Sequence, residues 1–449
     1  MDTNKNSFII DTKWLIPVVP EGIVLEDHSL VISNNLIIDI CPHQQAHDNH
    51  PGLAIEDLTQ HAVMPGLINT HSHAAMSLLR GYADDKSLMD WLENYIWPIE
   101  GALVCHDFVY DGTTLAIAEM ISSGTTCTAD SYFFPNAVAA AFDDHYFRGQ
   151  IACPIVQFAT NWANDEDEHL SKAMQFHDQY KHHPQIYPAL APHAPYSVSD
   201  RGFEEIAKQS QAHNIPVHLH LHETASEVLS ESDQRPLQRI YDHGLFSSLL
   251  QTVHMTQLND EEIQLLSANQ VHVAHCPDSN LKLASGFCPI DKLLKNGVNV
   301  AVGTDGSASN NNLDMLAEIR SAALLSKGVT LDPTSISAAQ ALSMGTINGA
   351  KLLGIDSQVG SLEIGKQADV VAIDMSPLEL QPVHNPISQI VYSANGSHVT
   401  DVWINGQRLL KDRKLTQLDT AALTDKVSRW HQSIRQAATQ SGTHTGTAT

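Results

Sequence analysis

The chain has 449 residues, of which 43% are hydrophobic and 17% charged, as is typical of a large, well-packed globular protein. Lys and Arg number 25 and Asp and Glu 51, so the net charge is −26, which argues against a nucleic-acid partner and against docking on an anionic membrane. No apolar run approaches the roughly 20 residues of a membrane-spanning helix. No leader-like segment opens the chain, and its six cysteines form no C-x-x-C pair, so we expect a soluble, cytoplasmic protein with free thiols.

The N-terminal segment reads as β-structure. Alternating apolar and polar residues predict strands within residues 7–42, with a turn at Asn34 and Asn35. Residues 64–69 then predict a short buried strand, with His71 and His73 at its carboxyl end. Alternate residues of a strand face the same side, and two imidazoles aimed at one point suit a divalent metal. Two polar residues in a loop are the alternative interpretation.

From about residue 64 to 355, strand-like runs alternate with helical patterns in close to eight units. This alternation predicts parallel strands joined by helices, and the number favours a closed (β/α)8 barrel of the TIM type over an open sheet. Barrel enzymes carry their catalytic groups where the strands end. Five predicted strand ends carry suitable groups: His193; His218, His220, His222 and Glu223; His254; His275; and Asp305.

These residues contain a candidate metal site. Three imidazoles and one carboxylate suit Zn²⁺, with Fe²⁺ as the alternative. His71, His73 and Asp305 would supply three ligands, and the run HLHLHE would supply the fourth. The pattern does not decide among His218, His220 and His222, because alternate residues share one face of a strand.

After residue 363 the pattern returns to short strands, and Asn405 and Gly406 predict a hairpin turn. Each terminal β segment is too small to bury a core alone, so we expect the two to pair into one small β-sandwich. Residues 424–436 predict a last helix with Val427, Trp430 and Ile434 on one face, followed by a disordered tail. The predicted organisation is 1–63 and 363–416 for the two parts of the sandwich, 64–362 for the barrel, and 417–449 for the helix and tail.

The segments PGLINTHSH, HLHLHET and VGTDGS together resemble the amidohydrolase superfamily. The segments MDWLENYIWPIE, APHAPYSVSD and HCPDSNLKLASG resemble its branch of S-adenosylhomocysteine/5-methylthioadenosine deaminases and related triazine hydrolases. The resemblance covers nearly the whole chain. It implies that His71, His73, His220 and Asp305 bind the metal, because Glu223 completes the family pattern H-x-x-E that begins at His220. The fourth predicted strand lacks the lysine that bridges two metals in binuclear members, so we expect one metal ion.

The residue types then suggest a division of labour. Asp305, both ligand and base, would take a proton from water, and Glu223 would carry a proton to a ring nitrogen. His254 would stabilise the hydroxide or the oxygen of the tetrahedral intermediate. The alternative for Glu223 is a carboxylate that stabilises the N-terminus of a helix. The alternative for His254 is a hydrogen-bonded residue of a short strand without a catalytic role.

Substrate contacts rest on the resemblance. It implies that Glu100 holds the ribose hydroxyls and that His193 lies near the purine or ribose, with Glu223 and Asp305 also contacting the substrate. Trp91 and Trp97 are candidates for an apolar wall, with a plain core position as the alternative. Arg148 is a candidate partner for a substrate carboxylate, with a surface arginine as the alternative.

We therefore expect a metal-dependent hydrolase that acts on the C–N bond of a cyclic amidine. It would deaminate S-adenosylhomocysteine or 5′-methylthioadenosine, with adenosine as a further candidate, to the inosyl product and ammonia. The alternatives are guanine deamination and chlorotriazine hydrolysis, which Glu100 disfavours because neither substrate carries a ribose. A non-catalytic barrel is disfavoured because all the candidate ligands are present. The expected partners are a purine nucleoside and further copies of the chain, in a dimer or tetramer.

Overall fold

The computed structural model describes residues 7–229 and 234–441, so the tail predicted to be disordered lies outside the described residues from residue 442 onward. Internal contacts divide the chain into two units. One unit contains Met1–Asn69, Ala118–Cys127 and Asp314–Leu418, and the other contains Thr70–Ile117, Thr128–Leu313 and Asp419–Thr449.

Eight parallel strands form the central sheet. They are β5 (Leu67–Ser72), β6 (Thr125–Asp130), β7 (Arg148–Ile155), β8 (Ile186–Pro192), β9 (Val217–Leu221), β10 (Leu250–His254), β11 (His272–His275) and β12 (Val300–Val302). Their order in the sheet follows the chain. The first and last strands meet, because Thr70 Oγ1 donates to the carbonyl of Val302 (2.9 Å) and the Asp305 N–H donates to the carbonyl of His71 (3.0 Å). The predicted (β/α)8 barrel is confirmed.

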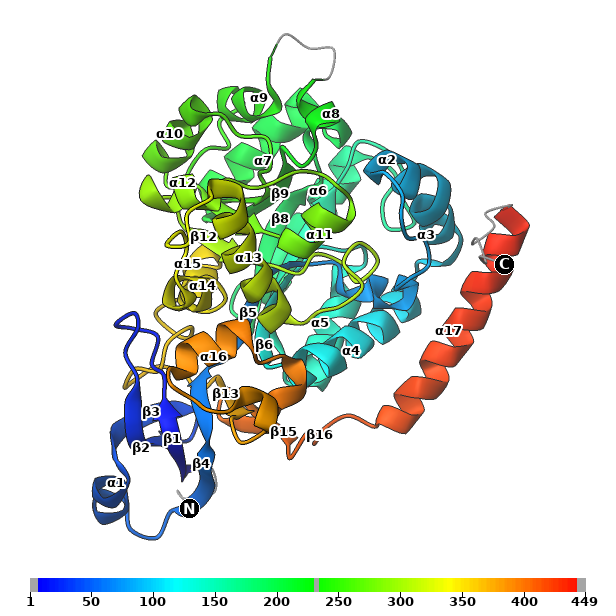
Figure 1. Ribbon diagram of the computed structural model, residues 1–449. Coiled ribbons are helices and arrows are strands. Elements are labelled where there is room, and N and C mark those ends of the chain that lie inside the picture. The colour runs from blue at the N-terminus through cyan, green and yellow to red at the C-terminus, as the bar shows by residue number, and fades with distance from the viewer. Residues whose placement is uncertain (1–6, 230–233, 442–449) are drawn as a thin grey trace. The chain divides into compact units, whose positions relative to one another are not determined.

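Helices pack along the outside of this barrel (Figure 1). They include α4 (His106–Ser122), α5 (Pro135–Asp144), α6 (Glu166–Tyr180), α7 (Asp200–His213), α9 (Pro236–Asp242), α10 (Asp260–Ala268) and α12 (Ile290–Lys295). α5 and α6 contact β7, and α6 and α7 contact β8. The sequence of α7 shows why it forms: the Ser199 side chain caps the N–H of Gly202, and Phe203 and Ile206, three residues apart, are both buried.

Shorter elements follow the carboxyl ends of the strands. They are η1 (Ala74–Leu79), α2 (Leu88–Trp91), η2 (Leu92–Ile96), α3 (Trp97–Leu103), η3 (Pro195–Ser197), α8 (Ala225–Val228) and α11 (Pro277–Lys282). The last helix, α17 (Thr420–Ser441), is longer than predicted, and its Trp430 donates a hydrogen bond to Asp111 (2.9 Å). None of the helices in the described part of the chain is both long and apolar enough to cross a membrane.

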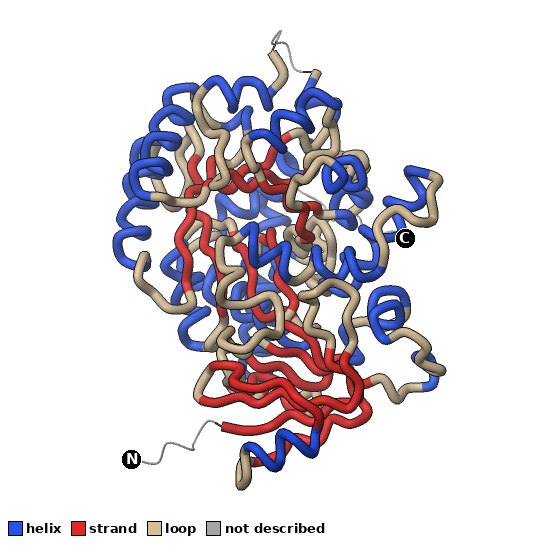
Figure 2. Tube along the Cα trace, turned by 90° about the vertical axis from the view of Figure 1, so that its left-hand side faces the viewer, coloured by secondary structure: helices blue, strands red, loops and turns tan. Residues whose placement is uncertain are grey.

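The two terminal segments form a second eight-stranded sheet, seen in Figure 2 as neighbouring red strands. Its order is β16-β15-β14-β13-β4-β1-β2-β3. The bounds are β1 (Ser7–Leu15), β2 (Leu25–Ser33), β3 (Leu36–Pro42), β4 (Ala54–Pro65), β13 (Val370–Asp374), β14 (Val399–Ile404), β15 (Gln407–Lys411) and β16 (Lys414–Leu415). β4 pairs with β1 on one side and with β13 on the other, so the segments share one sheet. The predicted turn at Asn405 and Gly406 joins β14 to β15 with φ of 51° and 74°.

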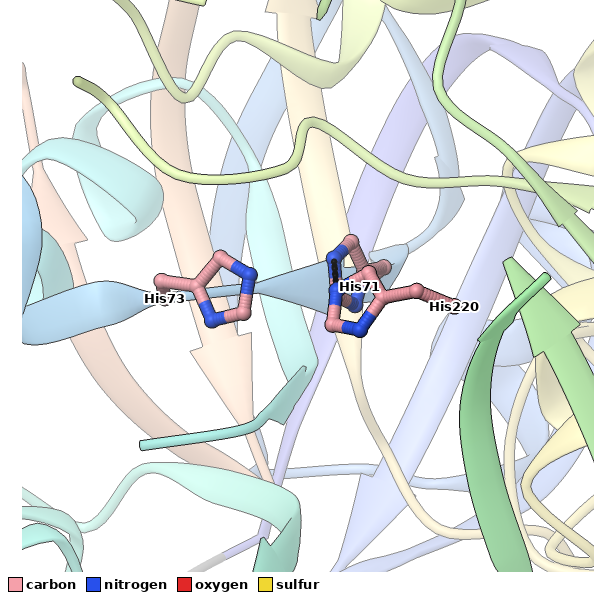
Figure 3. A group of neighbouring side chains, drawn as sticks. All are labelled: His71, His73 and His220. Carbon is pink, nitrogen blue, oxygen red and sulfur yellow. Dashed lines mark hydrogen bonds between the residues drawn. The ribbon is translucent and has the colours of Figure 1, made fainter. Parts of the chain in front are cut away.

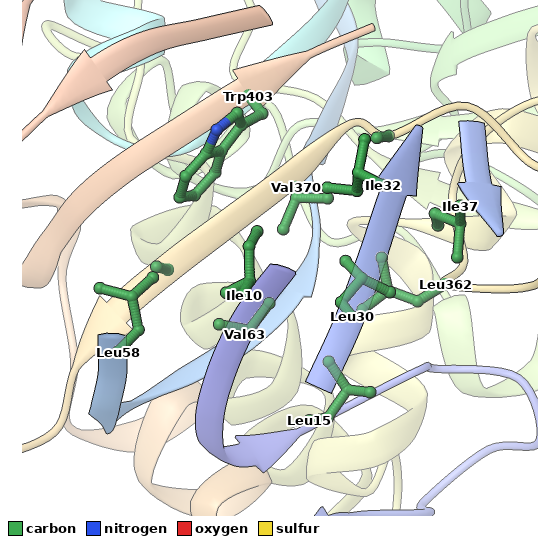
Figure 4. Packing of buried hydrophobic residues seen from close by; sticks show 12 residues of the cluster. Ile10, Leu15, Leu30, Ile32, Ile37, Leu58, Val63, Leu362, Val370 and Trp403 are labelled. Carbon is green, nitrogen blue, oxygen red and sulfur yellow. The ribbon is translucent and has the colours of Figure 1, made fainter. Parts of the chain in front are cut away.

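This second sheet curls over its own core (Figure 4). Phe8 of β1 and Trp403 of β14 are separated by two intervening strands, or about 14 Å in a flat sheet. Their ring centroids are nevertheless 6.2 Å apart. The buried cluster between the two halves draws on both segments and includes Ile10, Leu30, Ile32, Leu58, Val63, Val370 and Trp403. The same unit contains α1 (His43–Asn49), α13 (Met315–Thr330), α14 (Ala338–Met344), α15 (Ile347–Leu352), η4 (Leu378–Leu380), α16 (Pro386–Tyr392) and η5 (Gly396–His398).

The strand predicted over 64–69 is wrong at its start. Met64 and Pro65 end β4, and β5 begins at Leu67. Gly66 lies between them in close contact with a neighbouring strand, because a Cβ built there would collide with the Thr126 side chain. The continuous apolar run therefore belongs to two different sheets.

Candidate active site

Four predicted ligands lie at the carboxyl ends of barrel strands. β5 is buried along its whole length, and it contains His71 near its end and is followed directly by His73. His220 belongs to β9, the fifth strand, and Asp305 follows β12, the eighth. Segments far apart in the sequence are thus brought to one end of the barrel, where barrel enzymes carry their catalytic groups.

The candidate ligand atoms have the spacing of ligands around one small metal ion. His71 Nε2 lies 3.1 Å from His220 Nε2 and 3.2 Å from Asp305 Oδ1, and His73 Nε2 lies 3.4 Å from Asp305 Oδ1. Tetrahedral zinc with bonds of about 2.0–2.1 Å places neighbouring ligand atoms about 3.3 Å apart. Figure 3 shows the His73 ring facing the adjacent rings of His71 and His220. The spacing and the nitrogen and oxygen donors fit zinc.

The second nitrogen of each imidazole is already engaged. His73 Nδ1 donates to the carbonyl of Ser131 (2.6 Å), and His220 Nδ1 donates to the carbonyl of His193 (2.7 Å). A carbonyl only accepts, so both rings carry hydrogen on Nδ1 and leave the lone pair of Nε2 free. His71 Nδ1 bonds to His218 Nε2 (2.8 Å). All three Nε2 atoms are therefore available as ligands.

Burial keeps two of these rings neutral. It is the main cause that holds the pKa of His71 well below the usual value, although Asp305 opposes it. Burial, together with neighbouring histidines, does the same to the pKa of His220. A neutral imidazole is the form that binds a metal, so the site needs no deprotonation of these rings at neutral pH.

The carboxylate of Asp305 is fixed by several donors. Its Oδ2 accepts from Ser279 Oγ and Ser309 Oγ (both 2.7 Å), and its Oδ1 accepts from the N–H of Gly306 (2.7 Å). Burial acts to raise the pKa of Asp305, but the contact with His71 and the nearby imidazoles hold that pKa well below the usual range. Asp305 therefore faces the imidazoles as a carboxylate.

Glu223 and His254 face each other beside this cluster. His254 Nε2 lies 3.8 Å from Glu223 Oε1, while its Nδ1 bonds to Asn280 Oδ1 (2.9 Å). Burial raises the pKa of Glu223, with a smaller opposing effect of His254. The turn that carries Glu223 is held by Glu227, whose carboxylate accepts from the backbone N–H groups of His222 and Glu223 (both 2.9 Å). A buried carboxyl of raised pKa is suited to carrying a proton.

Glu100 lies on α3, directly after the π-helical turn η2. Its Oε1 accepts from the hydroxyl of Tyr132 (2.6 Å). Burial raises the pKa of Glu100 to about 6, and the Tyr132 hydrogen bond partly offsets the effect. Asn161 holds this helix end by donating from its side chain to the carbonyls of Gly101 (3.2 Å) and Val104 (2.9 Å).

These groups open onto one cavity of about 630 Å³. Its lining contains His73, Glu100, His193, His220, Glu223, His254 and Asp305, together with Trp91 and Trp97. Burial is the main cause that lowers the pKa of His193 to about 4, so this ring is neutral. The backbone carbonyl of His193 also orients His220, as described above. The structure thus brings all the predicted site residues except His71, which lies behind the lining, to one cavity wall.

Two of the histidines left open by the sequence are now placed. His218 lies behind His71 and passes its Nδ1 hydrogen bond on to Gln251 Oε1 (3.1 Å). The prediction that His218, His220 and His222 share a face is wrong for His222. β9 ends at Leu221, and His222 adopts a φ of 54° and accepts from the N–H of Leu237 (3.1 Å). The reversal of the chain at this turn directs its ring away from the cavity.

Arg148 fits neither interpretation made from the sequence. It is fully buried at the first residue of β7, at the opposite end of the strand from the site, and donates to the hydroxyl of Tyr187 (2.8 Å). It is absent from the lining formed by the described residues. Sequence reasoning also missed Tyr132 and Glu227. Neither stands out in the sequence, because each acts through a partner that only the fold supplies.

Comparisons with known proteins agree with this geometry. Residues 62–409 match the amidohydrolase family. A 5-methylthioadenosine/S-adenosylhomocysteine deaminase of Teredinibacter turnerae is 48% identical over 96% of this chain and 99% of its own. A 5′-deoxyadenosine deaminase of Methanosphaera stadtmanae is 39% identical over 87% and 91%. The crystal structure of an adenosine deaminase from Xanthomonas campestris with bound zinc superposes with a TM-score of 0.94 at 46% identity, covering 96% and 98%. The chain belongs to the amidohydrolase family.

Proposed function

We propose that this protein is a zinc-dependent deaminase of adenine nucleosides modified at the 5′ position, the class that contains 5′-methylthioadenosine, S-adenosylhomocysteine and 5′-deoxyadenosine. The products are the corresponding inosyl nucleoside and ammonia. The observation that carries the proposal is that the metal-ligand cluster, the proton-carrying Glu223 and the ribose acceptor Glu100 all serve one cavity. The names of the relatives described above support the same substrate class.

His71, His73, His220 and Asp305 would hold the metal. A zinc ion bound there supplies a water molecule of lowered pKa, and hence a hydroxide nucleophile at neutral pH. Asp305 takes the proton that this water releases. Its carboxylate is kept in place for that task by Ser279 and Ser309.

Glu223 moves the other proton. Its carboxyl donates to the purine N1, which makes C6 more electrophilic, and the hydroxyl oxygen adds to C6. The amino group then leaves as ammonia with the proton from Asp305, and the new hydroxyl returns its proton to Glu223 as the C6 carbonyl forms. One water is consumed and both carboxyl groups end in their starting state. His254, whose Nδ1 is tied to Asn280, directs its Nε2 toward the reacting oxygen.

Glu100 distinguishes nucleosides from free bases. A carboxylate accepts two hydrogen bonds, which matches the 2′ and 3′ hydroxyls of a ribose. Tyr132 holds one carboxylate oxygen and so sets the orientation of the acceptor. His193 lies in the same lining, where its neutral ring would contact the purine or ribose.

A substrate panel tests the proposal. Ammonia release by the zinc-loaded protein is measured with 5′-methylthioadenosine, adenosine, adenine, guanine and a chlorotriazine, for the native protein and Glu100→Gln. We expect turnover of the nucleosides, with kcat/KM at least about tenfold lower in the variant because one hydrogen bond to a charged group is lost. Turnover of only a free base, or chloride release from the triazine with Glu100 dispensable, would overturn the substrate class.

The setting of the enzyme stays a prediction. All six cysteines are free, which supports a reducing compartment such as the cytoplasm. Assembly into a dimer or tetramer is a further expectation, and gel filtration with light scattering would measure it.

A further inference from the structure

The cavity has two kinds of wall. One end carries the imidazoles and carboxylates described above. The rest is built mainly from the segment after β5 and from the ends of β6 and β7. Its apolar side chains are Met76, Leu88, Trp91, Leu92, Ile96, Trp97, Val104, Phe133, Val156, Phe158 and Leu283. If the adenine and ribose occupy the polar end, as the proposed function requires, the 5′ substituent meets apolar groups.

The charged groups that face this cavity are all acidic. Among the described residues that line it are Glu100, Glu223 and Asp305, and none is a lysine or arginine. The residues outside the described part of the chain contain a single cationic side chain, that of Lys5. The lining histidine away from the candidate ligands and from Glu223, His193, is neutral because burial lowers its pKa to about 4. A carboxylate brought into the cavity therefore finds no positive partner.

The nearest cations along the chain are engaged elsewhere. Lys282, beside the lining residue Leu283, binds Asp84 (2.6 Å), and Lys172 binds Glu168 (2.8 Å). Arg148 is buried at the far end of its strand. A substrate carboxylate would have to pull one of these side chains from its partner or enter unpaired.

The mouth of the cavity is aromatic and uncharged. Trp97 is 37% exposed, Tyr196 44% and Phe158 47%, and all three belong to the lining. Such rings make favourable contacts with a thioether sulfur. A cavity of about 630 Å³ also lies within the size range that encloses most of the surface of a bound small molecule. The size would admit a long substituent, so its charge becomes the deciding property.

We propose that this enzyme selects nucleosides whose 5′ substituent is uncharged, so that 5′-methylthioadenosine and 5′-deoxyadenosine are its substrates and the zwitterionic S-adenosylhomocysteine is discriminated against. The inference rests on the proposed function and narrows its substrate class. The physical reason is that a carboxylate taken from water into a cavity lined by apolar and acidic groups loses its hydration and gains no partner.

A set of three thioethers separates charge from size. The kcat/KM of the zinc-loaded enzyme is measured with 5′-methylthioadenosine, S-adenosylhomocysteine and 5′-butylthio-5′-deoxyadenosine, an uncharged analogue with a substituent of similar length. We expect the two uncharged thioethers to agree within about tenfold and S-adenosylhomocysteine to fall at least about 100-fold below the butylthio analogue. Equal values for S-adenosylhomocysteine and the butylthio analogue would overturn the inference, as would exclusion of both long substrates.

A charge introduced at the mouth provides the converse test. Phe158→Arg supplies a cation at a half-exposed position, and Phe158→Gln is the matched uncharged control. The ratio of kcat/KM for S-adenosylhomocysteine to that for 5′-methylthioadenosine should be at least about tenfold higher in the arginine variant. Equal ratios in the two variants would count against a missing cation as the cause. Failure of the proposed function would look different, because no thioether would release ammonia.

Discussion

At the scale of single residues, the direction of each candidate ligand is set by a neighbour. The clearest case is His71. The amide oxygen of Gln251 accepts from His218 Nδ1 (3.1 Å), which leaves His218 Nε2 to accept from His71 Nδ1 (2.8 Å). This relay leaves the lone pair of His71 Nε2 pointing at the site. Outer partners of this kind explain why a histidine without a direct role can lie beside a metal ligand.

Glu223 should be needed for proton transfer and Glu227 only for position. Glu223→Gln keeps the shape of the side chain but removes its proton, so kcat for 5′-methylthioadenosine should fall by about 100-fold to 10,000-fold. Glu227→Gln keeps Glu223 and weakens one of two hydrogen bonds to the turn, so kcat should fall only about tenfold. Steady-state kinetics on both zinc-loaded variants measures the difference. Equal losses, or an active Glu223→Gln variant, would contradict the assigned roles.

The titration of Glu100 should appear in substrate binding. Below its pKa of about 6 the carboxyl is protonated and accepts hydrogen bonds less well, so the KM for 5′-methylthioadenosine should rise as pH falls through this value. The hydroxyl of Tyr132 lowers this pKa, so Tyr132→Phe should raise it and move the rise in KM to higher pH. KM measured from pH 5 to 8 for both proteins tests the sign. A shift to lower pH in the variant would refute the assignment.

At the scale of elements, the site depends on the contact between the first and last barrel strands. A Cβ built on Gly303, just after β12, would lie 2.6 Å from the backbone nitrogen of His71. Gly303→Ala should therefore push the two strands apart and weaken zinc binding at least about tenfold, the lower end of losses seen when ligand supports are disturbed. Competition with a chromogenic chelator measures the affinity. Gly328→Ala, where a Cβ has nothing within 4 Å, is the matched control. Unchanged affinity in Gly303→Ala would contradict this role of the seam.

Much of this element order could be predicted, because hydrophobic periodicity carries it. The barrel, the turn at Asn405 and Gly406 and the long last helix follow from local pattern. Local pattern failed where the chain changes sheet at Gly66, since the apolar run continues through the change. It failed again at His222, because alternation holds only while the strand lasts. Contacts such as Tyr132 with Glu100 join residues 32 positions apart and have no local signal.

At the scale of the whole molecule, the candidate ligands come from three distant parts of the chain. β5, β9 and the segment after β12 would all be joined by one bound ion. A ligand that binds only the folded state stabilises it by an amount that grows with its concentration, about 4 kcal/mol at one thousand times Kd. Removal of zinc by a chelator should therefore lower the Tm by several degrees in the native protein. His71→Ala should show a much smaller change, and an equal change in both proteins would argue against zinc at this site.

The central claim is a deaminase that works with one metal ion. The most direct test is a zinc titration of metal-stripped protein, with ammonia release from 5′-methylthioadenosine as the readout. The four ligands described here predict that the stripped protein is inactive and that the rate rises linearly with zinc and levels off at one equivalent per chain. A rate that does not depend on zinc, or one that levels off only at two equivalents, would contradict the single-metal site.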